Sequence, residues 1–139
     1  MKSIISVKVR YPETDRMGIV YHANYYPWFE LGRLDFIEKC KASYADMEKA
    51  GLLMPVTETH CRYLKPCVFG DEVTVETVLT QLTVARCRFE YRILNKGEVA
   101  AQGSTGHAFA DENLHAINIR KRFPEIWNTL TFAMKESNL

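Results

Sequence analysis

The sequence lacks a long apolar run, a pair of closely spaced cysteines and an excess of either charge. No hydrophobic stretch approaches the roughly 20 residues needed to cross a bilayer, so we expect no membrane span. With 18 basic and 17 acidic residues the formal net charge is +1, which gives no overall field to attract nucleic acid. Any site for a polyanion must therefore be local, and we expect no nucleic-acid partner.

The four cysteines are scattered, with neither a C-x-x-C pair nor clustered histidines beside them: Cys40, Cys61, Cys67 and Cys87. This spacing indicates neither a zinc site nor a thioredoxin-type redox motif, and we expect no metal. Near the start of the chain only Ile4 and Ile5 form an apolar pair before Lys8, too short for the apolar segment of a secretory signal. We therefore expect reduced thiols in a cytoplasmic protein.

The composition, 47% hydrophobic and 25% charged, is that of an ordinary globular protein. A chain of 139 residues fits one domain, which we expect to span 1–139. A domain of this size buries roughly two thirds of the surface that its unfolded chain exposes, enough for a core without disulfides or metals.

Over 3–10 apolar and polar residues alternate, as they do in a strand. Later in the first half of the chain the apolar residues recur with helical periodicity. A loop around Pro12 leads to a long helix that we expect to begin between His22 and Asn24 and to end near Cys40. Asn24 is the expected N-cap, and Pro27 falls in the first turn, where its missing N–H costs little. The apolar stripe of this helix recurs every three or four residues: Tyr25, Phe29, Gly32, Phe36 and Cys40.

The second half reads mostly as strands. A short helix is expected first, with Ser43 as its cap and Gly51 as its end. Strands follow at 54–64, 72–80, 85–94 and 98–110, then a short edge strand at 115–119 and a helix that opens at Pro124. One long helix with four or five antiparallel strands is an α+β pattern, and wrapping the sheet around the helix buries both.

The stretch 11–25 places an acid, Asp15, in a loop that leads through Gly18 into the start of the long helix. The first turn of a helix presents unpaired backbone N–H groups, which suit a developing oxyanion. A carboxylate nearby could attack a carbonyl or activate a water, and acyl transfer needs both features together. The residue types alone leave a simpler alternative open, in which Asp15 caps a turn and Gly18 supplies a positive φ.

Three segments together resemble the 4-hydroxybenzoyl-CoA thioesterase-like hotdog family, over about residues 7 to 112. The most specific is the run Thr14-Asp15…Met17-Gly18-Ile19-Val20-Tyr21-His22-Ala23-Asn24-Tyr25…Trp28-Phe29-Glu30…Arg33. The other two are Tyr63-Leu64-Lys65-Pro66 with Phe69-Gly70-Asp71, and Thr105-Gly106-His107-Ala108-Phe109.

This resemblance implies a hotdog fold, in which an antiparallel sheet of about five strands wraps a long central helix. It also implies edge-to-edge homodimers that assemble into a tetramer, with active sites at the dimer interface. The implied substrate is a small-to-medium acyl-CoA, so coenzyme A belongs to the substrate and no separate cofactor is expected.

The same resemblance assigns roles to individual residues. Asp15 matches the catalytic carboxylate, a general base or a nucleophile, and His22 matches the position whose backbone N–H polarises the thioester carbonyl. Gly18 would allow close approach of the substrate, Val20 and Tyr21 would line the entry, and Tyr25 would belong to the core or to the acyl pocket.

The phosphates of coenzyme A require cations, and the candidates are Lys65 with Arg86 and Arg88 on one strand face. A solvated face is an equally simple interpretation of these charges. The stretch 80–84 is not basic, unlike that of family members acting on aromatic acyl groups, which weakens the case for 4-hydroxybenzoyl-CoA itself.

Two other functions stay open at the level of sequence: hydrolysis of acyl groups on acyl-carrier protein, and non-catalytic binding of acyl-CoA. A carrier-protein partner would need a basic docking patch, for which Arg120-Lys121-Arg122 is the densest candidate. The acid beside the helix start argues against a pure binding module. Glu30 and Arg33 lie three residues apart, and we expect a structural ion pair between them.

Overall fold

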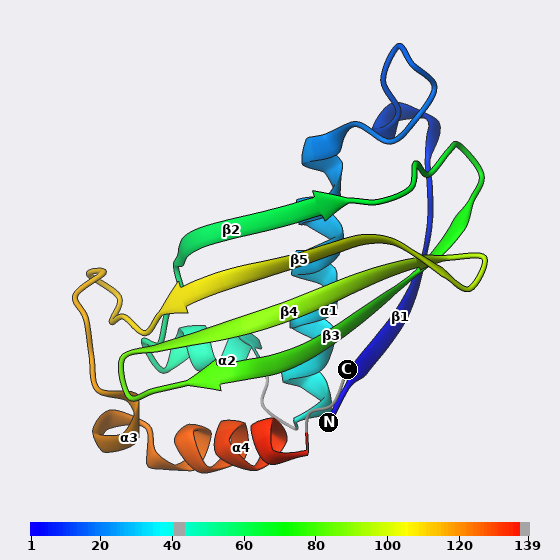
Figure 1. Ribbon diagram of the computed structural model, residues 1–139. Helices are drawn as coiled ribbons and strands as arrows, with labels where there is room; N and C mark the ends of the chain where they lie inside the picture. The colour runs from blue at the N-terminus through cyan, green and yellow to red at the C-terminus, as the bar shows by residue number, and fades with distance from the viewer. Residues whose placement is uncertain (41–43, 137–139) are drawn as a thin grey trace.

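The computed structural model describes residues 1–40 and 44–136, which form one five-stranded antiparallel sheet with helices against it (Figure 1). The strand order is β1-β3-β4-β5-β2. The strands are β1 (Ser3–Lys8), β2 (Val56–Tyr63), β3 (Glu72–Leu82), β4 (Arg86–Asn95) and β5 (Glu98–Ala108). The helices are η1 (Tyr11–Glu13), η2 (His22–Asn24), α1 (Tyr25–Lys39), α2 (Tyr44–Lys49), α3 (Ile119–Arg122) and α4 (Pro124–Lys135). The expected hotdog architecture is confirmed by this sheet, its long helix and the structural relatives described below.

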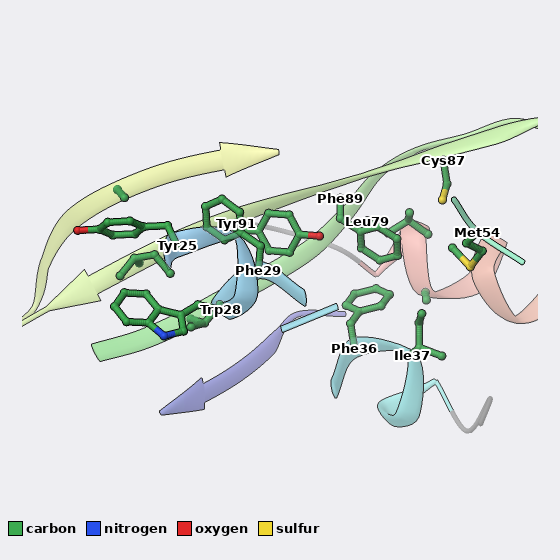
Figure 2. Close-up of a cluster of buried hydrophobic side chains, with 14 of the residues drawn as sticks. Tyr25, Trp28, Phe29, Phe36, Ile37, Met54, Leu79, Cys87, Phe89 and Tyr91 are labelled. Carbon is green, nitrogen blue, oxygen red and sulfur yellow. The ribbon is translucent and has the colours of Figure 1, made fainter. Parts of the chain in front are cut away.

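The long helix α1 crosses one face of the sheet, with its N-terminal end at the β2 edge (Figure 1). The expected stripe faces inward: Tyr25, Phe29, Gly32 and Phe36 are buried, and Cys40 is half-buried. Figure 2 shows the aromatic residues of α1 meeting those of the sheet, where Phe29 stacks on Tyr91 with ring centroids 4.5 Å apart. The alternating strand pattern therefore supplies one wall of the core, and the helical stripe supplies the other.

Gly32 marks the closest approach of α1 to the sheet. A Cβ at this position would lie 2.3 Å from Thr77 Oγ1 and 3.0 Å from Val75 Cγ1, both on β3. The absence of a side chain thus sets the distance between the helix and the sheet.

Two local predictions differ from the structure. Asn24 occupies the expected N-cap position of α1, but its side chain makes no capping hydrogen bond, because its amide donates instead to the Glu13 carbonyl at 2.8 Å. The segment 115–119 forms no strand beyond a single bridge, Ala110 with Ala116. Asn118 there accepts a hydrogen bond from Lys121 N–H and starts α3, so local capping overrides the expected strand. The expected cap Ser43 lies outside the described residues.

The edge strand β2 is exposed along seven of its eight residues and has no neighbour on its outer side in the sheet. An edge of this length with no covering element is the kind of surface that pairs with another strand. At the other end of the sheet, α4 packs on β3 through the buried residues Leu130 and Ala133. None of the described helices is long and apolar enough to span a membrane.

Candidate active site

A tight loop ahead of α1 holds Asp15 in place. The Asp15 N–H donates to the Ile19 carbonyl at 2.8 Å, and the Gly18 N–H donates to the Asp15 carbonyl at 3.0 Å. Gly18 has φ +81°, which glycine adopts without the strain that a side chain would add. One carboxylate oxygen of Asp15 accepts the Met17 N–H at 2.8 Å. Asp15 therefore does cap a turn, as the simpler alternative expected. Its second carboxylate oxygen accepts no hydrogen bond from the described residues.

Glu13 fastens this loop to the start of α1. Its backbone carbonyl accepts the Tyr21 N–H at 2.9 Å and the Asn24 side chain at 2.8 Å. Its carboxylate accepts the Trp28 indole N–H at 3.2 Å. Because these contacts join the two ends of the loop to a buried tryptophan, Asp15 and the helix start keep a fixed relation to each other.

The chain enters α1 through the 3-10 turn η2, which begins at His22. Within the described part of the chain, the backbone N–H groups of His22 and Ala23 have no hydrogen-bond partner, as expected for the first residues of a helix. The Tyr63 hydroxyl donates to the His22 carbonyl at 2.7 Å and thereby holds the peptide that carries the Ala23 N–H. Two backbone donors are thus available at the helix start.

A cavity of about 310 Å³ brings Asp15, His22 and Tyr63 together, and Ala23 is not among its lining residues. Five of the residues expected at the site line it: Asp15, Val20, His22, Tyr25 and Lys65. It also has five lining residues to which the sequence assigned no role in the site: Met17, Ile19, Tyr63, Leu64 and Pro66. The segment Tyr63-Leu64-Lys65-Pro66 was the available signal for the last three, because it carries part of the family resemblance.

The remaining predicted residues lie outside this cavity. Gly18 is in the loop behind Asp15, and a Cβ added to it would meet nothing within 4 Å. Tyr21 is exposed and packs on the His22 ring with centroids 4.4 Å apart.

Arg86 and Arg88 line a different cavity, of about 150 Å³, beside the first residues of β2. The cavity of Asp15 adjoins Tyr63, the last residue of that strand. Val56 and Tyr63, the two ends of β2, are seven residues apart, which at about 3.3 Å per residue is a distance of roughly 20 Å. A single chain therefore does not bring these two arginines to Asp15.

The walls of the cavity are largely apolar, with few charges. Tyr25 is buried, and this burial raises the pKa of its hydroxyl above the ordinary value. The hydroxyl also shares a hydrogen bond with the Cys67 thiol. Lys65 at the rim pairs with Glu98, an exposed ion pair of small energetic value. Asp15 is therefore the only carboxylate among the described lining residues of this cavity.

Within the described residues, no three His, Cys, Asp or Glu side chains gather closely enough to hold a metal ion. The groups at this site with acid–base or donor capacity are the Asp15 carboxylate, the His22 imidazole and its free backbone N–H, the Tyr25 and Tyr63 hydroxyls and the Lys65 ammonium. A carboxylate in one cavity with an unpaired backbone N–H is an arrangement for chemistry at a carbonyl.

Comparison with known proteins identifies the family of the chain. The sequence pattern of the thioesterase-like superfamily matches residues 9–126. The chain is 40% identical to YneP of Bacillus subtilis (strain 168), provisionally named an acyl-CoA thioesterase, over 88% of this chain and 90% of that protein.

Among solved structures, a DHNA-CoA thioesterase from Staphylococcus aureus is 36% identical and superposes with a TM-score of 0.93, covering 99% of this chain and 97% of the other. A protein from Thermus thermophilus titled hypothetical protein TT1821 is 34% identical, with a TM-score of 0.87 and coverage of 96% and 98%. The chain belongs to the thioesterase-like superfamily. It is a thioester hydrolase with the hotdog fold.

Proposed function

We propose that this enzyme hydrolyses a small-to-medium acyl-CoA to the free acid and coenzyme A, with Asp15 as the catalytic carboxylate. The observation that carries the proposal is the cavity lined by both Asp15 and His22, whose backbone N–H at the helix start is unpaired among the described residues. The acyl-CoA names of YneP and of the Staphylococcus aureus thioesterase support the choice of coenzyme A as the carrier.

In this mechanism the thioester carbonyl oxygen accepts the His22 N–H, which polarises the carbon and stabilises the oxyanion that forms. Asp15 either removes a proton from the attacking water or attacks the carbonyl carbon itself. The coenzyme A thiolate then leaves and takes a proton from solvent. The His22 ring, which lines the cavity, orients the substrate, and Val20 lines the path by which it enters. Gly18 and the exposed Tyr21, outside the cavity, border the approach to it.

The two routes differ in where the oxygen of water goes. In a single turnover in H₂¹⁸O with enzyme in excess, attack by Asp15 puts ¹⁸O into the Asp15 carboxylate when water opens the mixed anhydride there. General-base catalysis puts ¹⁸O into the released acid alone. Label found by mass spectrometry in the peptide that contains Asp15 therefore establishes the nucleophilic route.

We further propose that two copies pair through β2 to form a homodimer. The sequence of β2 is self-complementary for antiparallel pairing about a two-fold axis at His60. In this register Glu58 lies opposite the partner's Arg62, and Arg62 lies opposite the partner's Glu58. Neither side chain forms an ion pair within the described part of the chain, so both are available for this contact.

Antiparallel pairing also gives Arg86 and Arg88 a role. It places the Val56 end of one β2 beside the Tyr63 end of the other, so the cavity with the two arginines approaches the partner's Asp15 cavity. Arg86 and Arg88 of one protomer, with Lys65 of the other, then bind the coenzyme A phosphates. We expect two such dimers to form a tetramer, and we expect the reaction to need no added cofactor.

The test is a panel of acyl-CoA thioesters of increasing acyl length, with release of free thiol as the readout. The same acyl groups on acyl-carrier protein form a second arm, because that carrier is the principal alternative. Turnover of at least one acyl-CoA, retained after treatment with a chelator, supports the proposal. Binding of acyl-CoA without turnover, or turnover of carrier-protein substrates alone, contradicts it.

A further inference from the structure

Glu13 is a nearly buried carboxylate two residues before Asp15, and the mechanism above assigns it no role. Its side chain is only 12% exposed, which is unusual for a glutamate unless the carboxylate has partners. Glu13 is not among the described residues that line the cavity of Asp15, so its carboxylate does not face the thioester. Any effect of Glu13 on the reaction must therefore act through its neighbours.

Residues 13–21, which we call the Asp15 ribbon, run out and back as two short antiparallel limbs. Across the limbs, the Asp15 N–H donates to the Ile19 carbonyl at 2.8 Å. Asp15 lies near the tip of the ribbon, and His22 follows directly after its returning limb. Because one group is near the tip and the other is at the base, any tilt of the ribbon moves the Asp15 carboxylate relative to the His22 N–H.

Glu13 stands at the base of the Asp15 ribbon and joins it to the elements on both sides. Its carbonyl accepts the Tyr21 N–H at 2.9 Å, which closes the base. One carboxylate oxygen accepts the Arg10 N–H at 2.8 Å, two residues beyond the end of β1. The other accepts the indole N–H of Trp28 in α1 at 3.2 Å. A single carboxylate thus links the strand before the ribbon to the helix after it.

Trp28 gives this link a fixed end, because its ring belongs to the core and is only 1% exposed. It packs edge to face on Tyr25 with ring centroids 5.1 Å apart, and Figure 2 shows both rings in the cluster of buried side chains. Within the described part of the chain, its indole N–H donates to the Glu13 carboxylate alone. Since a buried indole N–H needs an acceptor, the ring and the carboxylate hold each other in place.

We propose that Glu13 is a positioning residue for the hydrolysis, because its contact with Trp28 sets the tilt of the Asp15 ribbon. That tilt directs the Asp15 carboxylate relative to the His22 N–H. The inference rests on the proposed function, in which these two groups act on one carbonyl. The precision required is high, since a catalytic group displaced by about 1 Å can lose about a hundredfold in rate. Glu13 contributes its two acceptor oxygens and takes no part in the chemistry itself.

The first variant is Glu13→Gln, which keeps the size of the side chain and replaces one acceptor oxygen with an amide NH₂. One of the two N–H groups that the carboxylate binds then faces another donor, so the link opens at one end. We expect kcat on the best acyl-CoA to fall about tenfold and KM to change less than about twofold. Glu76→Gln is the matched control, because Glu76 is a buried glutamate on β3 that also binds two donors, Lys2 and Arg92. Its kcat should stay within about twofold of wild type.

A second background separates positioning from a merely structural role. If Glu13 only supports the fold, its replacement costs the same whichever residue stands at position 15. If Glu13 directs the Asp15 carboxylate, its effect disappears in Asp15→Asn, where that carboxylate is absent. Single turnovers with enzyme in excess should therefore show a further loss of about twofold or less when Glu13→Gln is added to Asp15→Asn. Equal losses in both backgrounds overturn the assignment.

Trp28→Phe tests the link from its other end and keeps an aromatic ring in the core. Alone it should also lower kcat about tenfold, so the test remains decisive if Glu13→Gln does not fold. In the double variant no indole N–H opposes the amide NH₂, and the side-chain oxygen can bind the Arg10 N–H. The double variant should therefore be no slower than Glu13→Gln alone, and losses that multiply overturn the assignment.

The outcomes for Glu13 and for the proposed function are distinct. Wild-type kcat in folded Glu13→Gln and Trp28→Phe enzymes overturns the assignment of Glu13 and leaves acyl-CoA hydrolysis standing. Failure of the wild-type enzyme to hydrolyse any acyl-CoA overturns the proposed function instead. Urea unfolding of each variant shows that the comparison is made between folded proteins.

Discussion

Tyr63 is the residue that most closely supports the helix start, since its hydroxyl donates to the His22 carbonyl from the neighbouring strand. Replacing it with phenylalanine keeps the ring contacts with Tyr25 and His22 and removes this hydrogen bond together with the hydroxyl contact to Cys61. We expect kcat to fall about two- to tenfold in Tyr63→Phe, the value of a single hydrogen bond, with a smaller change in KM. Steady-state kinetics measures this, and Tyr11→Phe at an exposed position is the matched control. Equal effects of the two substitutions would remove Tyr63 from the mechanism.

His107 makes the stability of the fold depend on pH. Burial, together with the nearby Arg33 charge, lowers its pKa from 6.5 to about 4, although its hydrogen bond to Met54 opposes this. Between pH 6.5 and 4 the unfolded chain therefore binds a proton that the folded chain does not. Stability should fall as the pH drops through this range, by up to about 1.4 kcal/mol per pH unit.

Urea unfolding of His107→Gln beside His115→Gln checks this assignment. His115 is exposed, lies outside β2 and serves as the control. The slope of unfolding free energy against pH between 4.5 and 6.5 should flatten in His107→Gln alone. An unchanged slope in that variant would show that another group causes the dependence.

At the scale of elements, the hydrophobic periodicity of the sequence predicts which faces of the elements are buried. Local sequence explains the apolar stripe of α1, the alternation along β3 and β4, and the hairpin turn, in which Lys96 and Gly97 both have positive φ. The failures have non-local or competing causes. The Asn24 side chain donates its hydrogen bond to the carbonyl of Glu13, eleven residues earlier, and so does not cap the helix. Asn118 caps α3, and this short helix forms where the edge strand was expected.

Gly32 gives a prediction for the contact between helix and sheet. In an exposed helix, Gly→Ala stabilises by about 1 kcal/mol, but here the added methyl would collide with Thr77 on β3. We expect Gly32→Ala to lower the free energy of unfolding by about 1–3 kcal/mol, as overpacking does. Denaturant unfolding measures the sign, with Glu38→Ala on the exposed face as control. A stabilised Gly32→Ala protein would contradict the packing described for α1.

The candidate site shows the same division between local and non-local information. Asp15, His22 and Lys65 were identifiable from sequence because the motif residues are close in the chain or carry the family resemblance. Tyr63 and Leu64 join them through the position of β2 beside α1, which no local pattern specifies. Alternation placed Arg86 and Arg88 on one strand face but could not show that they lie at the opposite end of β2 from Asp15.

For the whole molecule, the proposed dimer is the feature on which the proposed binding of coenzyme A depends. Glu58→Arg places like charges opposite each other at two symmetry-related positions of the proposed register. We expect it to weaken the dimer by about tenfold, as measured by sedimentation equilibrium. The double variant Glu58→Arg/Arg62→Glu should restore the affinity. A single variant without effect, or a double variant without rescue, contradicts the register centred on His60. Tetramer formation, a single domain over 1–139 and a cytoplasmic location stay predictions.

Asp15 is held by its turn in the same cavity as His22, whose backbone N–H is free among the described residues. The most direct measurement is kcat/KM of Asp15→Asn on the best acyl-CoA substrate, beside Asp46→Asn on the short helix α2. Asparagine keeps the size of the side chain and its hydrogen bond from Met17, and removes the charge and basicity. The account predicts a loss of about a hundredfold or more in Asp15→Asn and none in the control, with both proteins folded. Activity within a few-fold of wild type in a folded Asp15→Asn enzyme would contradict it.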